Sequence, residues 1–144
     1  MDLQPVESAY TITGIKAYLY LSHNDALSKD ISDEPKGSLW NTVIGEGIAG
    51  SPSESTIVVV EVSGAPGQYQ TKKNIEVLVT EIGKKVVTKL KRKSPIGVLS
   101  KEGKFYAIFL VYEAGCLPLK ISARVLGQPD ETLEKKRINF ECGE

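Results

Sequence analysis

The sequence predicts an all-β protein, and three observations support this prediction. Apolar residues recur at every second position in most apolar segments, which is the side-chain period of a β-strand. These segments are rich in β-branched and aromatic residues, which favour strands. Segments rich in Gly, Pro and Ser separate them and supply the turns that successive strands need.

The chain divides into a first strand, a polar loop and a longer series of strands. The first strand is predicted at residues 10–22, and a loop rich in Ser, Asp, Lys, Gly and Pro at 23–38. The remaining strands are predicted within 39–142. Their expected ranges are 39–44, 56–62, 75–82, 85–93, 105–112, 119–126 and 137–142.

Three local patterns refine this order. The dipeptide Gly83-Lys84 between two predicted strands indicates a β-hairpin. Segment 105–112 is apolar on both faces, which is typical of a strand in the middle of a covered sheet or where two sheets meet. Segment 128–136 contains helix-forming residues, and Pro129 and Asp130 could open a single helical turn there.

Seven or eight strands must close on themselves to protect their edges, so we expect an immunoglobulin-like antiparallel β-sandwich. A chain of 144 residues has the usual size of one domain, and residues 1–144 are predicted to form a single one. Over residues 56–142 the order of strands and turns resembles immunoglobulin-like and fibronectin-III-like modules. This resemblance concerns architecture only, because Trp40 precedes both cysteines, and it implies no function.

Cys116 and Cys142, the two cysteines of the chain, permit one disulfide. If Leu126 lies opposite Lys135 in an antiparallel hairpin, Cys142 faces Leu119. Cys116 is then three positions away, so a small change of register would bring the sulfurs together. Two free thiols are the alternative. A catalytic or metal-binding pair is not expected, because the chain has no C-x-x-C motif and its only histidine is distant in sequence.

Charge and hydropathy argue against some classes of partner. The chain has 18 basic and 18 acidic residues, so its formal net charge of zero gives no global attraction to nucleic acid or to an anionic membrane. No segment reaches the ~18 consecutive apolar residues of a transmembrane helix, and residues 1–5 do not resemble a signal peptide. These features fit a cytoplasmic protein, and equally a secreted or periplasmic one whose signal peptide has been removed.

The sequence offers little support for an enzyme or a metal site. Residues 45–50 match G-x-G-x-x-G, but a β-branched strand follows instead of the helix that a dinucleotide site requires, so we expect a glycine-rich bend. His23 lies in a polar loop with no identifiable nucleophile beside it. No catalytic residue and no cofactor are therefore expected. The acidic residues of the loop leave one calcium hypothesis, with the candidate ligands Asp25, Asp30, Asp33 and Glu34.

Two surfaces are candidates for binding. One is a tyrosine row on the first strand, where Tyr18 and Tyr20 share a face and Tyr10 is in phase with them. The alternative interpretation is that these tyrosines form the outer edge of the sandwich core. The other is a cationic stripe in the basic run 84–93, whose alternative is an edge strand protected from aggregation by its lysines. The stripe comprises Lys89, Lys91 and Lys93.

These observations lead us to expect a non-catalytic binding or interaction module whose surface engages a protein or an envelope component. Another protein is the expected partner, nucleic acid is not, and the oligomeric state is left open. The alternatives are a small-ligand or carbohydrate binder that uses loop tips and the tyrosine face, and an enzyme of unknown class. A pocket lined by aromatic residues would favour the ligand binder, and a flat exposed apolar patch would favour a protein partner.

Overall fold

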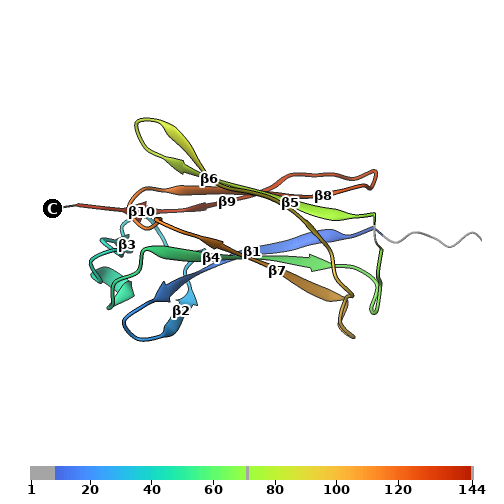
Figure 1. The fold of residues 1–144 in the computed structure, drawn as a ribbon, viewed down its shortest axis with the longest axis horizontal. Helices are drawn as coiled ribbons and strands as arrows, with labels where there is room; N and C mark the ends of the chain where they lie inside the picture. Colours follow the sequence, from blue (N-terminus) through green and yellow to red (C-terminus); the bar gives the residue numbers. More distant parts are fainter. Residues whose placement is uncertain (1–8, 71, 144) are drawn as a thin grey trace, which may run out of the picture.

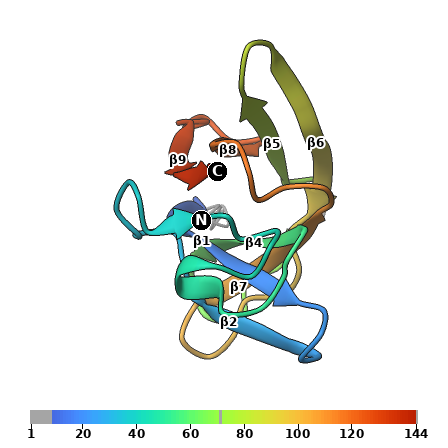
Figure 2. The same ribbon diagram turned by 90° about the vertical axis from the view of Figure 1, so that its left-hand side faces the viewer.

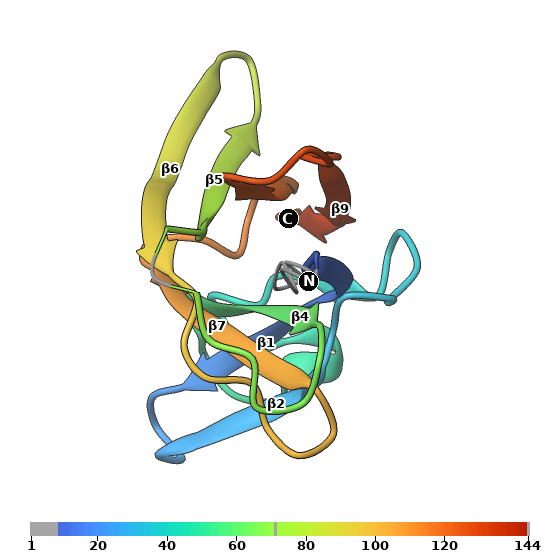
Figure 3. The ribbon, with the colours of Figure 1, turned by 90° about the vertical axis from the view of Figure 1, so that its right-hand side faces the viewer.

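The computed structural model describes residues 9–70 and 72–143, whose main regular elements are β-strands (Figure 1). Two four-stranded antiparallel sheets form two layers, one above the other (Figure 2). Figure 3 shows the same two layers from the opposite end of the molecule. Within the described residues no α-helix is present, and no helical segment there is long and apolar enough to cross a membrane.

The first sheet has the strand order β2-β1-β4-β7, and the second has the order β6-β5-β8-β9. The strands of the first sheet are β1 (Thr11–Leu21), β2 (Ala26–Asp30), β4 (Ser55–Ser63) and β7 (Lys104–Val111). Those of the second are β5 (Asn74–Ile82), β6 (Val86–Pro95), β8 (Leu119–Leu126) and β9 (Glu134–Ile138). A short parallel pair is formed by β3 (Leu39–Trp40) and β10 (Phe140–Glu141), and a single 3-10 turn, η1, covers Gly47–Ala49.

The alternating pattern in the sequence produces one hydrophobic core between the two sheets. The inward side chains of β4 are Val58, Val60 and Val62, and each is fully buried. One cluster of buried residues contains side chains from both sheets. Since burying a side chain such as valine or isoleucine contributes roughly 1.5–3 kcal/mol, this shared core is the main source of stability. At one end of the two layers, Leu39 and Phe140 of the short parallel pair are also fully buried.

Most predicted strands are present, including the hairpin around Gly83, which joins β5 to β6. Two predicted ranges are wrong in part. The predicted loop at 23–38 contains β2, which pairs with β1. The strand predicted at 39–44 ends after Trp40, because Asn41 adopts a left-handed backbone with φ of 49° and the chain turns there.

The C-terminal predictions also need correction. The helical turn predicted within 128–136 is absent, and β9 begins at Glu134. The strand predicted at 137–142 is interrupted at Asn139, since β9 pairs with β8 whereas β10 pairs with β3. The register of the last hairpin places Leu119 opposite Ile138 and not opposite Cys142.

The largest correction concerns the segment predicted at 105–112, which forms β7. This strand lies at the edge of the first sheet, with β4 on one side and no strand on the other among the described residues. Its inward side chains, including Phe109, contact the core, whereas the outward ones face solvent. β7 is therefore apolar on both faces, but the rest of the protein covers only its inward face.

Candidate functional site

The outer face of the first sheet carries a group of exposed and half-buried apolar side chains. The strand register places Tyr18, Ile57 and Leu110 in one row across β1, β4 and β7. In the next row Val59 and Ile108 lie beside Lys16 of β1. We call this surface the apolar face. It consists of Tyr18, Tyr20, Ile57, Val59, Tyr106, Ile108, Leu110 and Tyr112.

Exposure on the apolar face is greatest along β7 and at Tyr112, the residue that follows it. Ile108 and Tyr112 each expose 68% of their surface, and Tyr106 exposes 48%. By contrast, Ile57 and Val59 in the middle of the sheet are half-buried by their neighbours. Single exposed apolar residues are common on proteins, whereas large contiguous apolar patches are typical of interaction sites.

Tyr18 and Tyr20 lie on the apolar face, as the sequence suggested, but Tyr10 does not. The ladder between β1 and β4 shifts register between Ile12 and Gly14, which is a β-bulge. A bulge adds one residue to one strand and reverses the face on which all earlier residues lie. Tyr10 is accordingly buried, with only 2% of its surface exposed.

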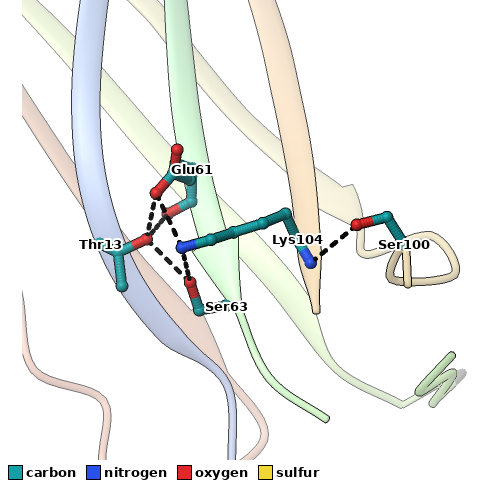
Figure 4. A network of polar contacts seen from close by, with 5 residues as sticks. All are labelled: Thr13, Glu61, Ser63, Ser100 and Lys104. Carbon is teal, nitrogen blue, oxygen red and sulfur yellow. Dashed lines mark hydrogen bonds and ion pairs between the residues drawn. The ribbon is translucent and has the colours of Figure 1, made fainter. Parts of the chain in front are cut away.

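A polar network borders the apolar face at one end (Figure 4). The Lys104 Nζ donates to Glu61 Oε1 at 3.1 Å and to Ser63 Oγ at 2.7 Å. The Thr13 hydroxyl donates to Glu61 Oε1 at 2.7 Å. The hydrogen bond from Thr13, followed by that from Lys104, lowers the pKa of Glu61 below its ordinary value. The network keeps this carboxylate charged and makes one border of the apolar face polar.

The outer face of the second sheet is basic. Its cations lie on three strands, whereas the stripe predicted from the sequence lay on one. The register brings together outward cations of β6, β8 and β9, and we call this surface the cationic face. Glu76 is the one carboxylate at the described strand positions of this face, and it pairs with Arg124 at 2.9 Å. The cations are Lys91, Lys93, Lys120, Arg124, Lys135 and Arg137.

The predicted stripe on β6 is broken by a second bulge. The ladder between β5 and β6 shifts register beside Val79, so that Leu90 pairs with Val79 and Thr88 with Thr80. Lys89 falls between these pairs and is half-buried, whereas Lys91 and Lys93 are exposed on the cationic face. β6 is an edge strand. This position agrees with the alternative interpretation, in which the lysines protect an edge from aggregation.

Each of the four candidate calcium ligands has a hydrogen-bond or ion-pair partner. The Asp30 carboxylate accepts hydrogen bonds from the backbone N–H groups of Ala17 and Ser32. Although burial opposes its ionisation, the hydrogen bonds from Ser32 and then Ala17 outweigh it, and the pKa of Asp30 is lowered. The other carboxylates pair elsewhere: Asp25 with Tyr20, Asp33 with Lys136 and Glu34 with Lys29.

No group of three or more potential metal ligands occurs within residues 9–70 and 72–143. His23 is exposed and borders a hollow of about 280 Å³ together with Glu54. No described hydrogen bond or ion pair joins these two side chains. The described geometry therefore does not arrange His23 as a base beside a nucleophile.

The hollows in the described surface do not resemble a ligand pocket. The most spacious of those found, about 600 Å³, lies beside the Cys116–Cys142 disulfide and is bordered by charged and polar residues such as Lys36 and Arg137. Its one aromatic residue, Phe140, is fully buried. The aromatic-lined pocket that would favour a small-ligand binder is not among these hollows.

Cys116 and Cys142 form a disulfide with a Cα–Cα distance of 4.6 Å. The observed register of β8 and β9 explains why they meet. The numbers of paired residues add to 257, as in the pair of Leu119 and Ile138. If this register is continued past Ile138, position 142 lies beside position 115, in the turn that precedes β8. The disulfide joins these two segments at one end of the layers.

The glycine-rich match at 45–50 forms a tight bend and not a dinucleotide site. It includes η1, and Gly45, Gly47 and Gly50 all have positive φ angles. A Cβ atom at Gly45 would lie 2.8 Å from the backbone nitrogen of Pro52. These glycines therefore permit a close return of the chain, as glycines in such bends commonly do.

Sequence reasoning found two tyrosines of the apolar face but missed its residues on β4 and β7. The sequence signal for the residues on β7 is the two-sided apolar pattern of 105–112, since one of its two apolar sides can be left exposed. Comparisons with protein-family models, curated proteins and solved structures find no match for this chain.

Proposed function

We propose that this protein is a non-catalytic interaction module that binds another protein through the apolar face. The observation that carries the proposal is the outward row of β7, in which Tyr106, Ile108 and Leu110 are all exposed; Tyr112, the residue that follows the strand, is exposed as well. While this row is exposed to water, the protein does not gain the free energy that burial of the row's apolar surface would provide. A partner that covers it recovers this free energy, which gives the face a physical reason to bind.

The composition of the apolar face favours a protein as the partner. Tyrosine combines a large rigid contact area with a polar hydroxyl, and aromatic residues are enriched at protein interfaces. The polar network of Thr13, Glu61 and Lys104 supplies a hydrated border like the rim of such an interface. A soluble small ligand would instead need a concave site, and the apolar face is the outer surface of a sheet.

We also propose that the fold is an immunoglobulin-like β-sandwich, which presents binding surfaces on a rigid frame. In such domains strands A, B and E share one sheet, while strand C′, where present, lies with C, F and G in the other. Strands β1, β4 and β7 would correspond to A, B and E. In the second sheet β6, β5, β8 and β9 would correspond to C′, C, F and G, in that spatial order. The disulfide fits a module that works in an oxidising compartment, such as a cell envelope.

Site-specific photo-crosslinking tests the proposed function. A benzophenone side chain placed at position 112 reports on the apolar face, and one at position 86 is the control. Val86 is equally exposed, at 68%, but lies on β6 of the other sheet. We expect adducts with a second, different protein at position 112 and not at 86. Each captured protein is then purified and titrated against the chain.

The titration decides whether the captured protein is a partner. Replacing Ile108 by Lys places a charge in the middle of the apolar face and should weaken binding by about tenfold or more, equivalent to at least about 1.4 kcal/mol. The matched change Val86→Lys should leave the affinity unchanged. Equal adducts at both positions, or equal affinities for both variants, would contradict the proposal.

A further inference from the structure

The four edge strands of the two sheets differ in how they are protected from pairing with another chain. Natural edges are protected by charged side chains, proline or bulges, because a bare edge offers unpaired backbone N–H and C=O groups. Three of the four edges carry such features. β2 has Lys29 and Asp30 and an irregular register with β1. β9 has the sequence Glu-Lys-Lys-Arg-Ile, and β6 has four cations, a bulge and Pro95.

β7 has none of these protections over seven of its eight residues. Its sequence is Lys-Phe-Tyr-Ala-Ile-Phe-Leu-Val, without proline, and its ladder with β4 runs through eight successive pairs without a shift of register. The single charge, on Lys104, is held within its own sheet by the ion pair with Glu61. The free edge of β7 is thus long, regular and apolar, which is the form of edge that accepts another strand.

We propose that two copies of this chain associate through antiparallel pairing of β7 with β7. The resulting dimer would contain one continuous eight-stranded sheet with a two-fold axis at its centre, an isologous arrangement. The inference deepens the proposed function and rests on the same exposure of β7. It adds that the apolar faces of two copies become one surface of twice the width, which remains open to the partner protein.

The alternation of side chains restricts the register of this pairing. Opposing residues of antiparallel strands lie on the same face, so an outward residue must pair with an outward residue. The outward positions of β7 are the even-numbered ones. The register centred on Ile108 satisfies this condition and pairs all central residues. It places Ile108 opposite Ile108, Tyr106 opposite Leu110, Ala107 opposite Phe109 and Phe105 opposite Val111.

This register suits a second copy because each of its central pairs is apolar and no like charges meet. The small Ala107 lies opposite the large Phe109, so the inward side chains have room beside each other. Lys104 falls opposite Tyr112 of the other copy and not opposite another cation. Aromatic and β-branched pairs such as Phe105 with Val111 stabilise paired strands relative to alanine pairs. The same pairing of β6 with β6 would bring lysines and arginine of two copies together.

Sedimentation velocity over a range of protein concentrations tests the dimer. A single strand pair is a small interface, so we expect reversible association that increases from low to high micromolar concentration. Ile108→Lys should raise the dimer dissociation constant by about tenfold or more, because two like charges then lie opposite each other. Val86→Lys, the matched change on β6, should leave the constant unchanged. A chain that is monomeric throughout, or equally affected by both substitutions, would overturn the proposal.

Cysteine crosslinking tests the register independently of the lysine variants. Both native cysteines are in the disulfide, so a new cysteine would be the only free thiol. In the proposed register Ile108→Cys brings two thiols within disulfide range, whereas Tyr106→Cys leaves them about 13 Å apart along the strand. We expect a covalent dimer from Ile108→Cys alone. Equal crosslinking of both variants, or none of Ile108→Cys, would overturn the register and the proposal.

The outcomes of this experiment and of the photo-crosslinking experiment are distinguishable. A monomeric chain that still forms adducts with a second protein would remove the dimer and leave the proposed function in place. A dimer that captures no other protein would support the pairing of β7 with β7 and contradict the proposed function.

Discussion

Tyr10 and Gln128, 118 positions apart in the sequence, form a reciprocal pair of hydrogen bonds. The Tyr10 backbone N–H donates to Gln128 Oε1 at 2.9 Å, and Gln128 Nε2 donates to the Tyr10 carbonyl at 2.8 Å. Both residues are buried. The side chain of Gln128 thus takes the place of a strand partner for the residue that precedes β1, and it ties the start of the first sheet to the loop after β8.

Gln128→Ala is predicted to destabilise the protein by roughly 3 kcal/mol, because two buried backbone groups of Tyr10 lose their partner. Urea unfolding, followed by circular dichroism, measures the change. Gln68→Ala is the control: Gln68 Oε1 accepts a hydrogen bond from the backbone of Ala65 in an exposed turn, where water can replace it. Equal losses in the two variants would show that burial of the Tyr10 pair does not matter.

Removal of the disulfide is predicted to lower the free energy of unfolding by roughly 3 kcal/mol, since it closes a loop with a sequence separation of 26 residues. The double variant Cys116→Ser/Cys142→Ser is compared with the oxidised protein by urea unfolding. Intact mass after alkylation, before and after reduction, shows whether the bond is present. Two alkylated cysteines in the unreduced protein would contradict the disulfide.

Glu61→Gln is predicted to destabilise the protein by about 1 kcal/mol near neutral pH, through loss of the partly exposed ion pair with Lys104. Because folding lowers the pKa of Glu61 from its ordinary value of 4.5, the native carboxylate stabilises the fold above that value. This contribution is lost as the pH falls through the lowered pKa. The difference between variant and parent should therefore disappear in acid.

The control for this pH dependence is Glu102→Gln, a change at an exposed residue in the turn before β7. Thermal unfolding of the parent and both variants is compared at neutral and at acidic pH. A difference between Glu61→Gln and the parent that stays constant across this range would show that the charge of Glu61 is not responsible.

The lysines of β6 are predicted to protect an edge. Replacing Lys89, Lys91 and Lys93 by Thr should leave the fold intact but promote aggregation, because a neutral edge with high strand propensity accepts further strands. Replacing the same residues by Glu should keep the protein soluble, since either sign of charge protects an edge. Light scattering at rising concentration measures both. Salt-dependent loss of heparin binding in the Glu variant would instead identify the cationic face as a binding surface.

The local elements of the fold could be predicted from sequence with good accuracy. The strand at 119–126 has the predicted bounds. β4 is longer than predicted by one residue at each end, and β5 by one residue at its start. The period of two is a local property that each strand carries in its own side chains. The predictions at 39–44 and 137–142 were wrong because their limits depend on Asn41 and on pairing between β3 and β10, which are distant in sequence.

The candidate site was only partly predictable. Tyr18 and Tyr20 lie on one outer face, and Lys91 and Lys93 on the other, because residues of one strand share a face at a fixed spacing. Their neighbours on other strands depend on strand order and register. Tyr10 was placed on the wrong face because a single bulged residue reverses the alternation.

The sequence by itself determined that the protein is built of strands and which side chains alternate along each one, because backbone sterics and side-chain period are local. Only the tertiary structure decided which strands lie at the edges, and therefore that β7 exposes an apolar row while lysines occupy the edge at β6. The physical reason is that strand order arises from contacts between residues far apart in the chain. Burial of one shared core fixes those contacts, and no local pattern encodes them.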